Sequence, residues 1–388
     1  MSQVTVSRRG VERLRSGHVW VYRSDLVSTD GVLPGSLVQV TDERGKFLGT
    51  ALYSSASQIA IRLISREPVP DFSALLRERI QAAVAYRERV VRDTDAYRVI
   101  FSEGDFLPGL IADRYNDILS IQVLTQAMEA GPVREIVLSE LASRLKPEAI
   151  AERVEPKIRE LEQLPPRTSG LLHGEKTSTI LTMNGIKFHY DALAGQKTGS
   201  FLDQRENYAA AAQYARGEAL DVFCYHGGFA LHLAPHCSRV TGVDSSRPAL
   251  EVADRNAALN GCEIEWLEAN AFDLLRDYAA AGHQYDTIVL DPPAFAKSKR
   301  NLETALRGYK ELNLRALRML RPGGTLVTCS CSYHVSAAQF IEVIVDSARD
   351  VHRNLRLLEN RTQGKDHPIL LEVPETAYLK CLIMSVSD

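Results

Sequence analysis

Hydrophobic and polar positions divide the chain into segments with different periods. Up to about Glu67 the apolar residues form short β-rich runs between glycine-containing turns, a pattern typical of a small β-barrel. These runs cover residues 18–22, 36–40, 47–53 and 58–64. Pro68 and Pro70 follow, and the apolar spacing then predicts a helix over residues 72–92.

The middle segment mixes strand and helix periods. Strand-like runs cover residues 97–101, 110–113 and 118–123, and a helical pattern follows at 132–145. The Pro165-Pro166 pair with Ser169-Gly170 marks the end of this segment.

From about Gly217 apolar strands alternate with helical stretches, as in a doubly wound sheet. Strands are predicted at 219–224, 239–243, 264–268, 287–290 and 325–328, then a helix at 337–349 and closing strands at 355–360 and 378–385. We therefore predict a multidomain α/β protein. A β-barrel covers residues 1–68, a mixed α/β domain 69–184, and a Rossmann-like domain with a seven-stranded, mostly parallel sheet 185–388.

Charge is unevenly distributed along the chain. Residues 1–68 hold nine Lys/Arg and six Asp/Glu, a local excess of +3 in a chain whose formal net charge is −3. Basic side chains beside aromatic ones suit phosphate contacts combined with base stacking. The predicted RNA-binding residues are Arg8, Arg9, Arg13, Arg15 and Trp20. The alternative is a basic helix that is merely solvated.

The remaining composition excludes several classes of protein. With 45% hydrophobic residues the chain is not disordered as a whole. No apolar run is long enough to span a membrane, and no secretory signal opens the chain, so we expect a cytoplasmic protein with no membrane partner. The six cysteines include no C-x-x-C pair, which argues against a zinc site, and we expect no metal.

Polar residues follow the predicted strands where an α/β sheet binds its ligand. The first strand runs into Gly227-Gly228, which lacks the G-x-G-x-x-G pattern of NAD and FAD sites. Asp244 ends the second strand, where it could accept the hydroxyls of a ribose or cap the next helix. Asn270-Ala271 follows the third strand and could face an adenine, although Asn270 alone is also a common helix cap.

The last two parallel strands carry the candidate chemistry. Asp291-Pro292-Pro293 fixes a rigid turn after the fourth strand. Cys329 and Cys331 lie at the end of the fifth, where a nucleophile would be needed. If that strand continued, both cysteines would face the same side.

Several motifs resemble, in order along most of the chain, class I S-adenosylmethionine-dependent rRNA methyltransferases, most closely the bacterial large-subunit rRNA cytosine-5 methyltransferase I family. They are Gly195-Gln196-Lys197-Thr198-Gly199, Phe201-Leu202-Asp203-Gln204-Arg205, Tyr225-His226-Gly227-Gly228-Phe229, Asp291-Pro292-Pro293-Ala294-Phe295, Arg307-Gly308-Tyr309-Lys310, Ser330-Cys331-Ser332 and Asp366-His367-Pro368. The resemblance implies an N-terminal PUA-like RNA-binding domain, S-adenosyl-L-methionine as cofactor and large-subunit ribosomal RNA as partner. It leaves a homodimer open.

The resemblance also implies roles for single residues. Cys331 matches the catalytic cysteine and Asp291 would contact the target base. Asp244 would bind the ribose, Asn270 and Ala271 the adenine, and Tyr225 and Gly227 the methionine end. The other implied cofactor-site residues are Lys197, Asp203 and Gln204 at the entrance, with Phe223, Ser245, Asp291 and Pro292. The chain departs from the family pattern at Asn270, where aspartate is common, and at Ser200, which replaces an aromatic residue.

A cysteine suits this chemistry because carbon 5 of cytosine is a poor nucleophile until a thiolate has added to carbon 6. Many RNA cytosine-5 methyltransferases place a second cysteine after the fourth strand, but this chain has Pro-Pro-Ala there. Cys329, a water or Asp291 must then remove the carbon 5 proton. The main alternative function is a non-covalent N-methyltransferase acting on an exocyclic amine of an RNA purine. An RNA-binding assembly factor with a degenerate cofactor site and a small-molecule methyltransferase are further alternatives.

Overall fold

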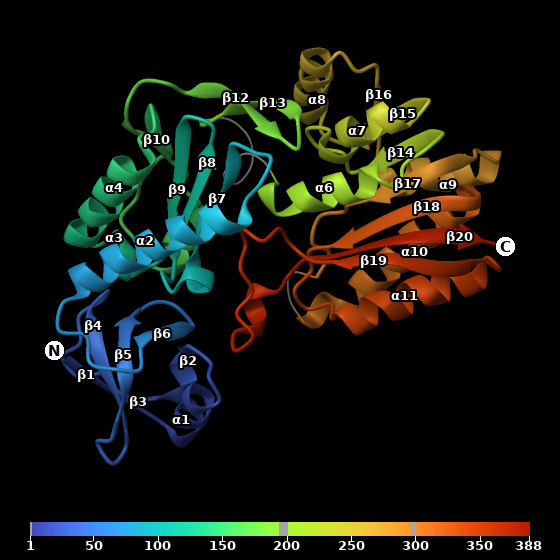
Figure 1. The fold of residues 1–388 in the computed structure, drawn as a ribbon. Helices are drawn as coiled ribbons and strands as arrows, with labels where there is room; N and C mark the ends of the chain where they lie inside the picture. The colour runs from blue at the N-terminus through green and yellow to red at the C-terminus, as the bar shows by residue number, and fades with distance from the viewer. Residues whose placement is uncertain (1, 194–200, 297–298) are drawn as a thin grey trace. The chain divides into compact units, whose positions relative to one another are not determined.

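The computed structural model describes residues 2–193, 201–296 and 299–388, and these form two compact units (Figure 1). The first unit contains residues 2–181, 190–193 and 365–376. The second contains residues 182–189, 201–296, 299–364 and 377–388. The predicted domain boundaries at 68/69 and 184/185 stay predictions.

The first unit begins with a six-stranded sheet in the order β2-β6-β5-β4-β1-β3. Its strands are β1 (Ser2–Val6), β2 (Trp20–Tyr22), β3 (Leu26–Ser28), β4 (Leu37–Asp42), β5 (Phe47–Tyr53) and β6 (Ile59–Ser65). Helix α1 (Arg8–Arg15) starts at Ser7, whose side chain accepts a hydrogen bond from the Gly10 amide. Val11 and Leu14 of this helix join the core of the sheet, so α1 packs against the module rather than extending into solvent.

A second, five-stranded sheet of the same unit has the order β11-β10-β9-β8-β7. It consists of β7 (Ala96–Phe101), β8 (Leu110–Tyr115), β9 (Ile118–Val123), β10 (Ala149–Glu152) and β11 (Gly170–His173). The helices of this part are α2 (Phe72–Val90), α3 (Gln126–Glu129), α4 (Gly131–Leu145) and α5 (Pro156–Leu161). One apolar core joins α2 and α4 to the sheet and also includes Leu52 and Ile64 of the N-terminal sheet.

Residues 365–376 return to the first unit from far along the chain. The buried Arg87 guanidinium donates a hydrogen bond to the Asp366 carbonyl (2.7 Å) and also pairs with Asp105. The Arg98 amide donates to the Asp366 carboxylate (2.9 Å). These contacts give the Asp-His-Pro motif a structural place in the first unit. The strands β12 (Ser178–Met183) and β13 (Ile186–Asp191) form a separate two-stranded sheet.

The second unit is built on a seven-stranded sheet in the order β16-β15-β14-β17-β18-β20-β19. Its strands are β14 (Glu218–Val222), β15 (Arg239–Asp244), β16 (Glu265–Glu268), β17 (Tyr285–Leu290), β18 (Leu320–Ser330), β19 (Asn354–Arg361) and β20 (Lys380–Ser387). Strands β14 to β18 pair in parallel, and β20 pairs antiparallel with β18 and β19. This confirms the predicted seven-stranded, mostly parallel sheet and places the last strand inside it.

Helices cover both faces of this sheet. Helices α9 (Ala271–Ala281), α10 (Leu302–Met319) and α11 (Ala337–Asp350) contribute to one core, and α6 (Arg205–Ala212) and α7 (Gly228–Leu233) to another. Helix α8 (Arg247–Asn260) completes the alternation. None of the helices in the described ranges combines the length and apolar character that a membrane span requires.

The sequence pattern missed several short elements, and several predicted strand ends differ from the observed ones by two to five residues, as for β14 and β18. Strands β1, β3 and β10 to β13 were not predicted. Strand β18 ends at Ser330, so Cys331 lies beyond it and the condition for Cys329 and Cys331 to share a strand face is not met.

Gly242 in β15 provides a test of how tightly this sheet is packed. A Cβ atom at this position would lie 2.3 Å from the Trp266 ring and 3.2 Å from the Cys224 sulfur. We expect Gly242→Ala to lower the free energy of unfolding by about 1–3 kcal/mol, because the core must open to admit the methyl group. Thermal unfolding followed by circular dichroism measures the effect. Gly170→Ala is the matched control, since no atom lies within 4 Å of its Cβ position; equal losses in the two variants would contradict this account.

Candidate active site

Strand register brings the predicted site residues of the second unit to one edge of the sheet. Val222 of β14 pairs with both Val243 of β15 and Leu290 of β17, and Leu290 pairs with Thr328 of β18. The residues that follow these positions therefore lie at the same level. They are Phe223, Asp244, Asp291 and Cys329.

Asp244 organises the loop that follows β14. One carboxylate oxygen accepts a hydrogen bond from the Tyr225 amide (3.0 Å) and the other from the Ser246 amide (2.9 Å). Ser246, not Asp244, is the N-cap of α8. Each carboxylate oxygen keeps a lone pair, so Asp244 can still accept a ribose hydroxyl.

Asp221 adds a buried carboxyl group to the same edge. One of its oxygens accepts a hydrogen bond from the Ala230 amide (2.8 Å), and the other is buried with no hydrogen-bond partner among the described residues. Burial, followed by the nearby charges of Asp291 and Asp244, raises the pKa of Asp221 to about 8. At neutral pH this carboxyl group is therefore mostly protonated, and a positive charge placed beside it would favour the carboxylate form.

The backbone after β14 adopts left-handed conformations at several residues. Phe223 and Tyr225 have positive φ angles of 68° and 49°, and Gly227, the N-cap of α7, has φ 83°. A Cβ on Gly227 would lie 2.9 Å from the Trp266 ring. The Tyr225 ring stacks on His226, with ring centroids 3.7 Å apart. Positive φ at residues with side chains is unusual and is concentrated at binding sites.

Asn270 is the N-cap of α9. Its side-chain oxygen accepts hydrogen bonds from the Phe272 amide (3.0 Å) and the Asp273 amide (3.3 Å). The side-chain nitrogen is the atom of Asn270 that can donate a hydrogen bond to a ligand. Ala271, the first residue of α9, is buried, and Ser245 is exposed.

A chain of hydrogen bonds ends on Asp291. Arg361 Nε donates to Asn207 Oδ1 (2.9 Å), Asn207 Nδ2 donates to Gln204 Oε1 (2.7 Å), and Gln204 Nε2 donates to Asp291 Oδ1 (2.9 Å). Because a guanidinium can only donate, it fixes which way the Asn207 amide faces, and Asn207 in turn fixes Gln204. Asp291 is thereby held as a hydrogen-bond acceptor.

Cys331 lies against the turn that carries Asp291. Its sulfur is 3.9 Å from the Pro292 carbonyl oxygen. The serines on either side of it are buried and both hydrogen-bond the Tyr309 hydroxyl at 2.9 Å. The Ser332 hydroxyl also accepts a hydrogen bond from the Ala296 amide (3.2 Å). Tyr309 therefore fixes the cysteine loop beside the Asp-Pro-Pro turn.

Lys380 of β20 holds the same loop from the other side. Its ammonium group donates to the carbonyls of Ser332 (2.7 Å), Val335 (3.0 Å) and Tyr378 (3.0 Å). Burial lowers the pKa of Lys380 to about 8, while the neighbouring Cys331 acts in the opposite direction. A negative sulfur and this positive amine therefore stabilise each other.

Cys329 occupies a different environment from Cys331. It is fully buried and pairs across the strands with Cys381. Burial, with the adjacent Cys381, raises the pKa of the Cys329 thiol well above its usual range. A thiol that resists ionisation is poorly suited to act as nucleophile or base.

The predicted RNA-binding residues lie in the first unit. Arg8, Arg9 and Arg15 are exposed on α1, and Arg8 pairs with Glu12 one turn away (2.9 Å). Arg13 is half-buried, with its guanidinium 4.6 Å from the Tyr22 ring centroid. Trp20 is half-buried too, and its indole nitrogen donates to Glu103 (3.0 Å). Three of the five side chains are thus open to a ligand.

The structure brings together the predicted residues that follow β14, β15, β17 and β18, while Lys197 lies outside the described residues. Asp203 accepts a hydrogen bond from the Tyr378 hydroxyl (2.6 Å). Sequence reasoning did not select Asn207, Tyr309, Arg361 or Lys380. Tyr309 belongs to the Arg307-Gly308-Tyr309-Lys310 motif, and Lys380 is a charged residue within the predicted apolar strand 378–385. No local signal marked Asn207 or Arg361. Within the described ranges, no group of three or more His, Cys, Asp or Glu side chains could hold a metal ion.

Comparison with protein families and curated proteins agrees with this architecture. A model described as an S-adenosylmethionine-dependent methyltransferase matches residues 157–384, and one described as a PUA-like domain matches residues 4–66. The ribosomal RNA large subunit methyltransferase I of Shewanella denitrificans is 40% identical over 391 residues, which cover 97% of this chain and 98% of that protein. The protein of that name from Vibrio cholerae is 39% identical over 380 residues, 95% of each chain.

A solved structure shares the whole fold. SMU.776, described as a methyltransferase and crystallised with SAH, has a TM-score of 0.85 at 20% identity and covers 99% of this chain and 100% of its own. Because the family model that matches residues 157–384 is that of S-adenosylmethionine-dependent methyltransferases, the cofactor of this chain is S-adenosylmethionine. On the identity and coverage of its relatives, the chain belongs to the ribosomal RNA large subunit methyltransferase I family of S-adenosylmethionine-dependent methyltransferases.

Proposed function

We propose that this protein methylates carbon 5 of a cytosine in large-subunit ribosomal RNA, in the cytoplasm, using Cys331 as a covalent catalyst. The observation that supports this most directly is the placement of Cys331 against the Asp291-Pro292 turn, with its loop anchored by Tyr309 and Lys380. The relatives' name supplies the rRNA substrate. A non-covalent N-methyltransferase would not need an anchored thiol beside the base-contacting turn.

The side chains at the sheet edge fit S-adenosylmethionine. The cofactor carries a sulfonium and an ammonium group, and the unpartnered oxygen of Asp221 offers them a buried negative charge. Asp244 has lone pairs left for the ribose hydroxyls. The outward-facing amide nitrogen of Asn270 suits a ring nitrogen of adenine rather than its amine, because the oxygen is committed to the helix cap.

In this mechanism the cofactor supplies a methyl group as an electrophile, and the protein activates the base. The Cys331 thiolate would add to carbon 6 of cytosine and move the ring electrons to carbon 5. Carbon 5 would then bond to the methyl group as the methyl–sulfur bond breaks, and the cofactor sulfur would leave as a neutral thioether. A base then removes the carbon 5 proton, and the thiolate leaves carbon 6 as the ring double bond returns. Lys380 stabilises the thiolate before addition and after release.

Among the three candidates for that base, the surroundings favour Asp291 over Cys329. The Cys329 thiol is fully buried and resists ionisation. Asp291 is held as an acceptor by Gln204, which favours the carboxylate over the acid. It can act directly or through a water.

The Cys331 assignment can be tested by substitution. Cys331→Ala should lower transfer of labelled methyl groups to rRNA by roughly 10⁴-fold, because the covalent route is lost. Cys329→Ala is the matched control and should retain activity. Nucleoside mass spectrometry identifies the product, and full activity of Cys331→Ala with an N-methyl purine as product would establish the non-covalent alternative.

The hydrogen-bond chain to Asp291 predicts a pH effect. In Asn207→Asp, Gln204 must turn its amide nitrogen toward the new carboxylate and its oxygen toward Asp291, so Asp291 becomes harder to ionise. We expect the acid limb of the pH–rate profile to move up by about one pH unit. Arg361 can pair with the new carboxylate, which protects the fold.

Asn313→Asp is the control for this variant, because Asn313 is equally buried but bonds to the Tyr309 carbonyl instead. It should leave the midpoint of the acid limb unchanged. An unshifted profile in Asn207→Asp would refute the positioning role of the chain.

Asp221 should make cofactor affinity depend on pH. Without cofactor, the raised pKa keeps Asp221 protonated up to about pH 8. Protonated Asp221 contributes to folding stability, and this contribution is lost as the pH rises through about 8. A bound cation favours the carboxylate, so affinity for S-adenosylmethionine should rise between about pH 6 and pH 8.5. Calorimetry should show a weaker dependence in Asp221→Asn and an unchanged one in Asp277→Asn, an exposed control.

A further inference from the structure

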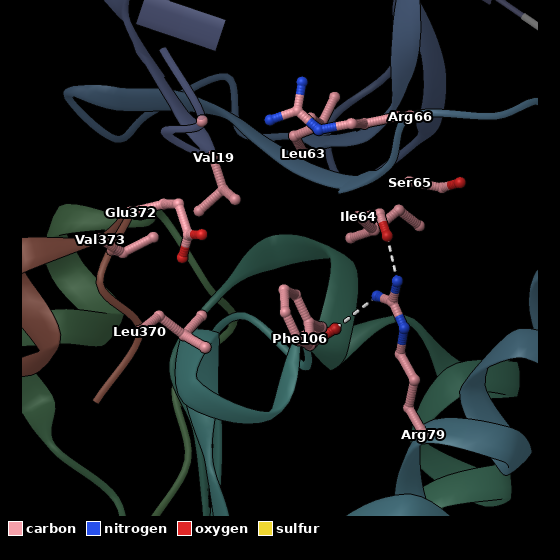
Figure 2. A pocket seen from close by; sticks show the side chains of 11 residues that line it. Val19, Leu63, Ile64, Ser65, Arg66, Arg79, Phe106, Leu370, Glu372 and Val373 are labelled. Carbon is pink, nitrogen blue, oxygen red and sulfur yellow. Dashed lines mark hydrogen bonds between the residues drawn. The ribbon is translucent and has the colours of Figure 1, made fainter. Parts of the chain in front are cut away.

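A pocket of about 360 Å³ lies within the first unit and takes no part in the site described above. The pocket is lined by residues from several segments of the unit (Figure 2). They are Gly17 and Val19 after α1, residues 63–66 at the end of β6, Arg79 of α2, Phe106, and residues 370, 372 and 373. Its size is at the lower end of the range for small-molecule sites and leaves room for one nucleotide rather than for a helix.

Phe106 gives the pocket an unusual wall. Its side chain is 46% exposed, and its backbone is left-handed, with φ 57°. Figure 2 shows its ring reaching into the pocket, with Val19 and Leu63 beyond it. A bulky residue in this conformation costs free energy, as does an aromatic ring left in water. An exposed ring over an apolar floor is the arrangement on which unpaired bases stack.

The charged side chains of the pocket complement the rest of a nucleotide. The Arg79 guanidinium donates to the carbonyls of Phe106 and Ile64 and lies 5.6 Å from the Phe106 ring centroid. Burial lowers the pKa of Arg79 only to about 10, so it stays positive at neutral pH. Arg66 is exposed, and one of its nitrogens donates to the Leu14 carbonyl at the end of α1 (3.1 Å). Glu372 offers an acceptor for an exocyclic amine.

We propose that this pocket binds one unstacked nucleotide of the RNA, with its base on Phe106, its amino edge toward Glu372 and its phosphate at Arg66. The proposal rests on RNA being the substrate, as argued above. It adds a recognition site in the first unit, made by Phe106, Arg66 and Glu372, to the basic surface of α1. An apolar peptide side chain could enter the same space but would not need the arginine.

The test uses the full chain and a fluorescein-labelled single-stranded RNA of mixed sequence, about 20 nucleotides long. Fluorescence anisotropy should show about 10-fold weaker binding for Phe106→Asn, which removes the ring but tolerates the left-handed backbone. Phe106→Trp should bind like the parent. Leu161→Asn removes another exposed apolar side chain of the same unit and should have no effect.

The phosphate contact is tested by salt dependence. Arg66→Gln should reduce the slope of log affinity against log salt by about 0.7, while Arg44→Gln, an exposed arginine outside the pocket, measures the effect of any surface charge. Cofactor affinity, measured by calorimetry, should be unchanged in every variant.

Phe106→Asn with parental RNA affinity would overturn the nucleotide pocket, and so would equal losses in Phe106→Asn and Leu161→Asn. If the parent protein still methylates rRNA, the proposed function survives that result. A parent protein that neither binds RNA nor transfers methyl groups to it would overturn both proposals.

Discussion

Parallel pairing in register brings the ends of β14, β15 and β17 together, and with them the carboxyl groups of Asp221, Asp244 and Asp291. The contacts described for these groups come from neutral donors: the amides of Ala230, Tyr225 and Ser246, and the Gln204 side chain. Neutral donors orient a carboxylate without cancelling its charge, and burial then penalises ionisation, as the raised pKa of Asp221 shows. An edge of this kind is completed by a cationic ligand. A sulfonium cofactor meets that need, whereas the pyrophosphate of a dinucleotide would add negative charge to it.

The proposed mechanism also requires a nucleophile at the same edge, and the two cysteines near it lie in different surroundings. Cys331 stands just past the end of β18, where Tyr309 fixes its flanking serines and the positive charge of Lys380 interacts with it. Cys329, two residues earlier, is inside the sheet and is kept neutral by burial. The end of the strand at Ser330 thus places the two cysteines in different surroundings, and this difference is the basis for proposing Cys331 as the nucleophile. The hydrogen-bond chain from Arg361 orients Asp291 in a similar way. The Arg361 guanidinium at the far end of this chain can only donate, so it fixes the orientation of the Asn207 and Gln204 amides that lead to Asp291.

Sequence reasoning recovered the features that depend on local pattern. Four of the parallel strands, β14, β15, β17 and β18, were predictable because each contains a buried apolar run. Cys331 and Asp291 were selected because their motifs follow such runs, and their roles stay predictions. Strand β1 was missed because its five residues include polar ones. Strand β10 was missed because it is only four residues long, and β11 to β13 because short, partly exposed strands carry little periodicity. The chain from Arg361 to Gln204 joins residues more than 150 positions apart, so nothing local could reveal it. Asn270 shows a different limit of local pattern: the sequence suggested both a helix cap and an adenine contact, and the structure shows that its side-chain oxygen is used by the cap.

The uneven charge of the chain follows from these opposing demands. A carboxylate-rich edge that attracts a sulfonium repels RNA phosphates, so affinity for RNA has to be generated elsewhere in the molecule. The first unit carries exposed arginines on α1 and an exposed aromatic ring at Phe106. The proposed mechanism also requires the target base to leave its stack before a thiolate can reach carbon 6, at a cost of a few kcal/mol. In the proposed mechanism, phosphate contacts on α1 and stacking on Phe106 would be the interactions of the first unit that offset that cost.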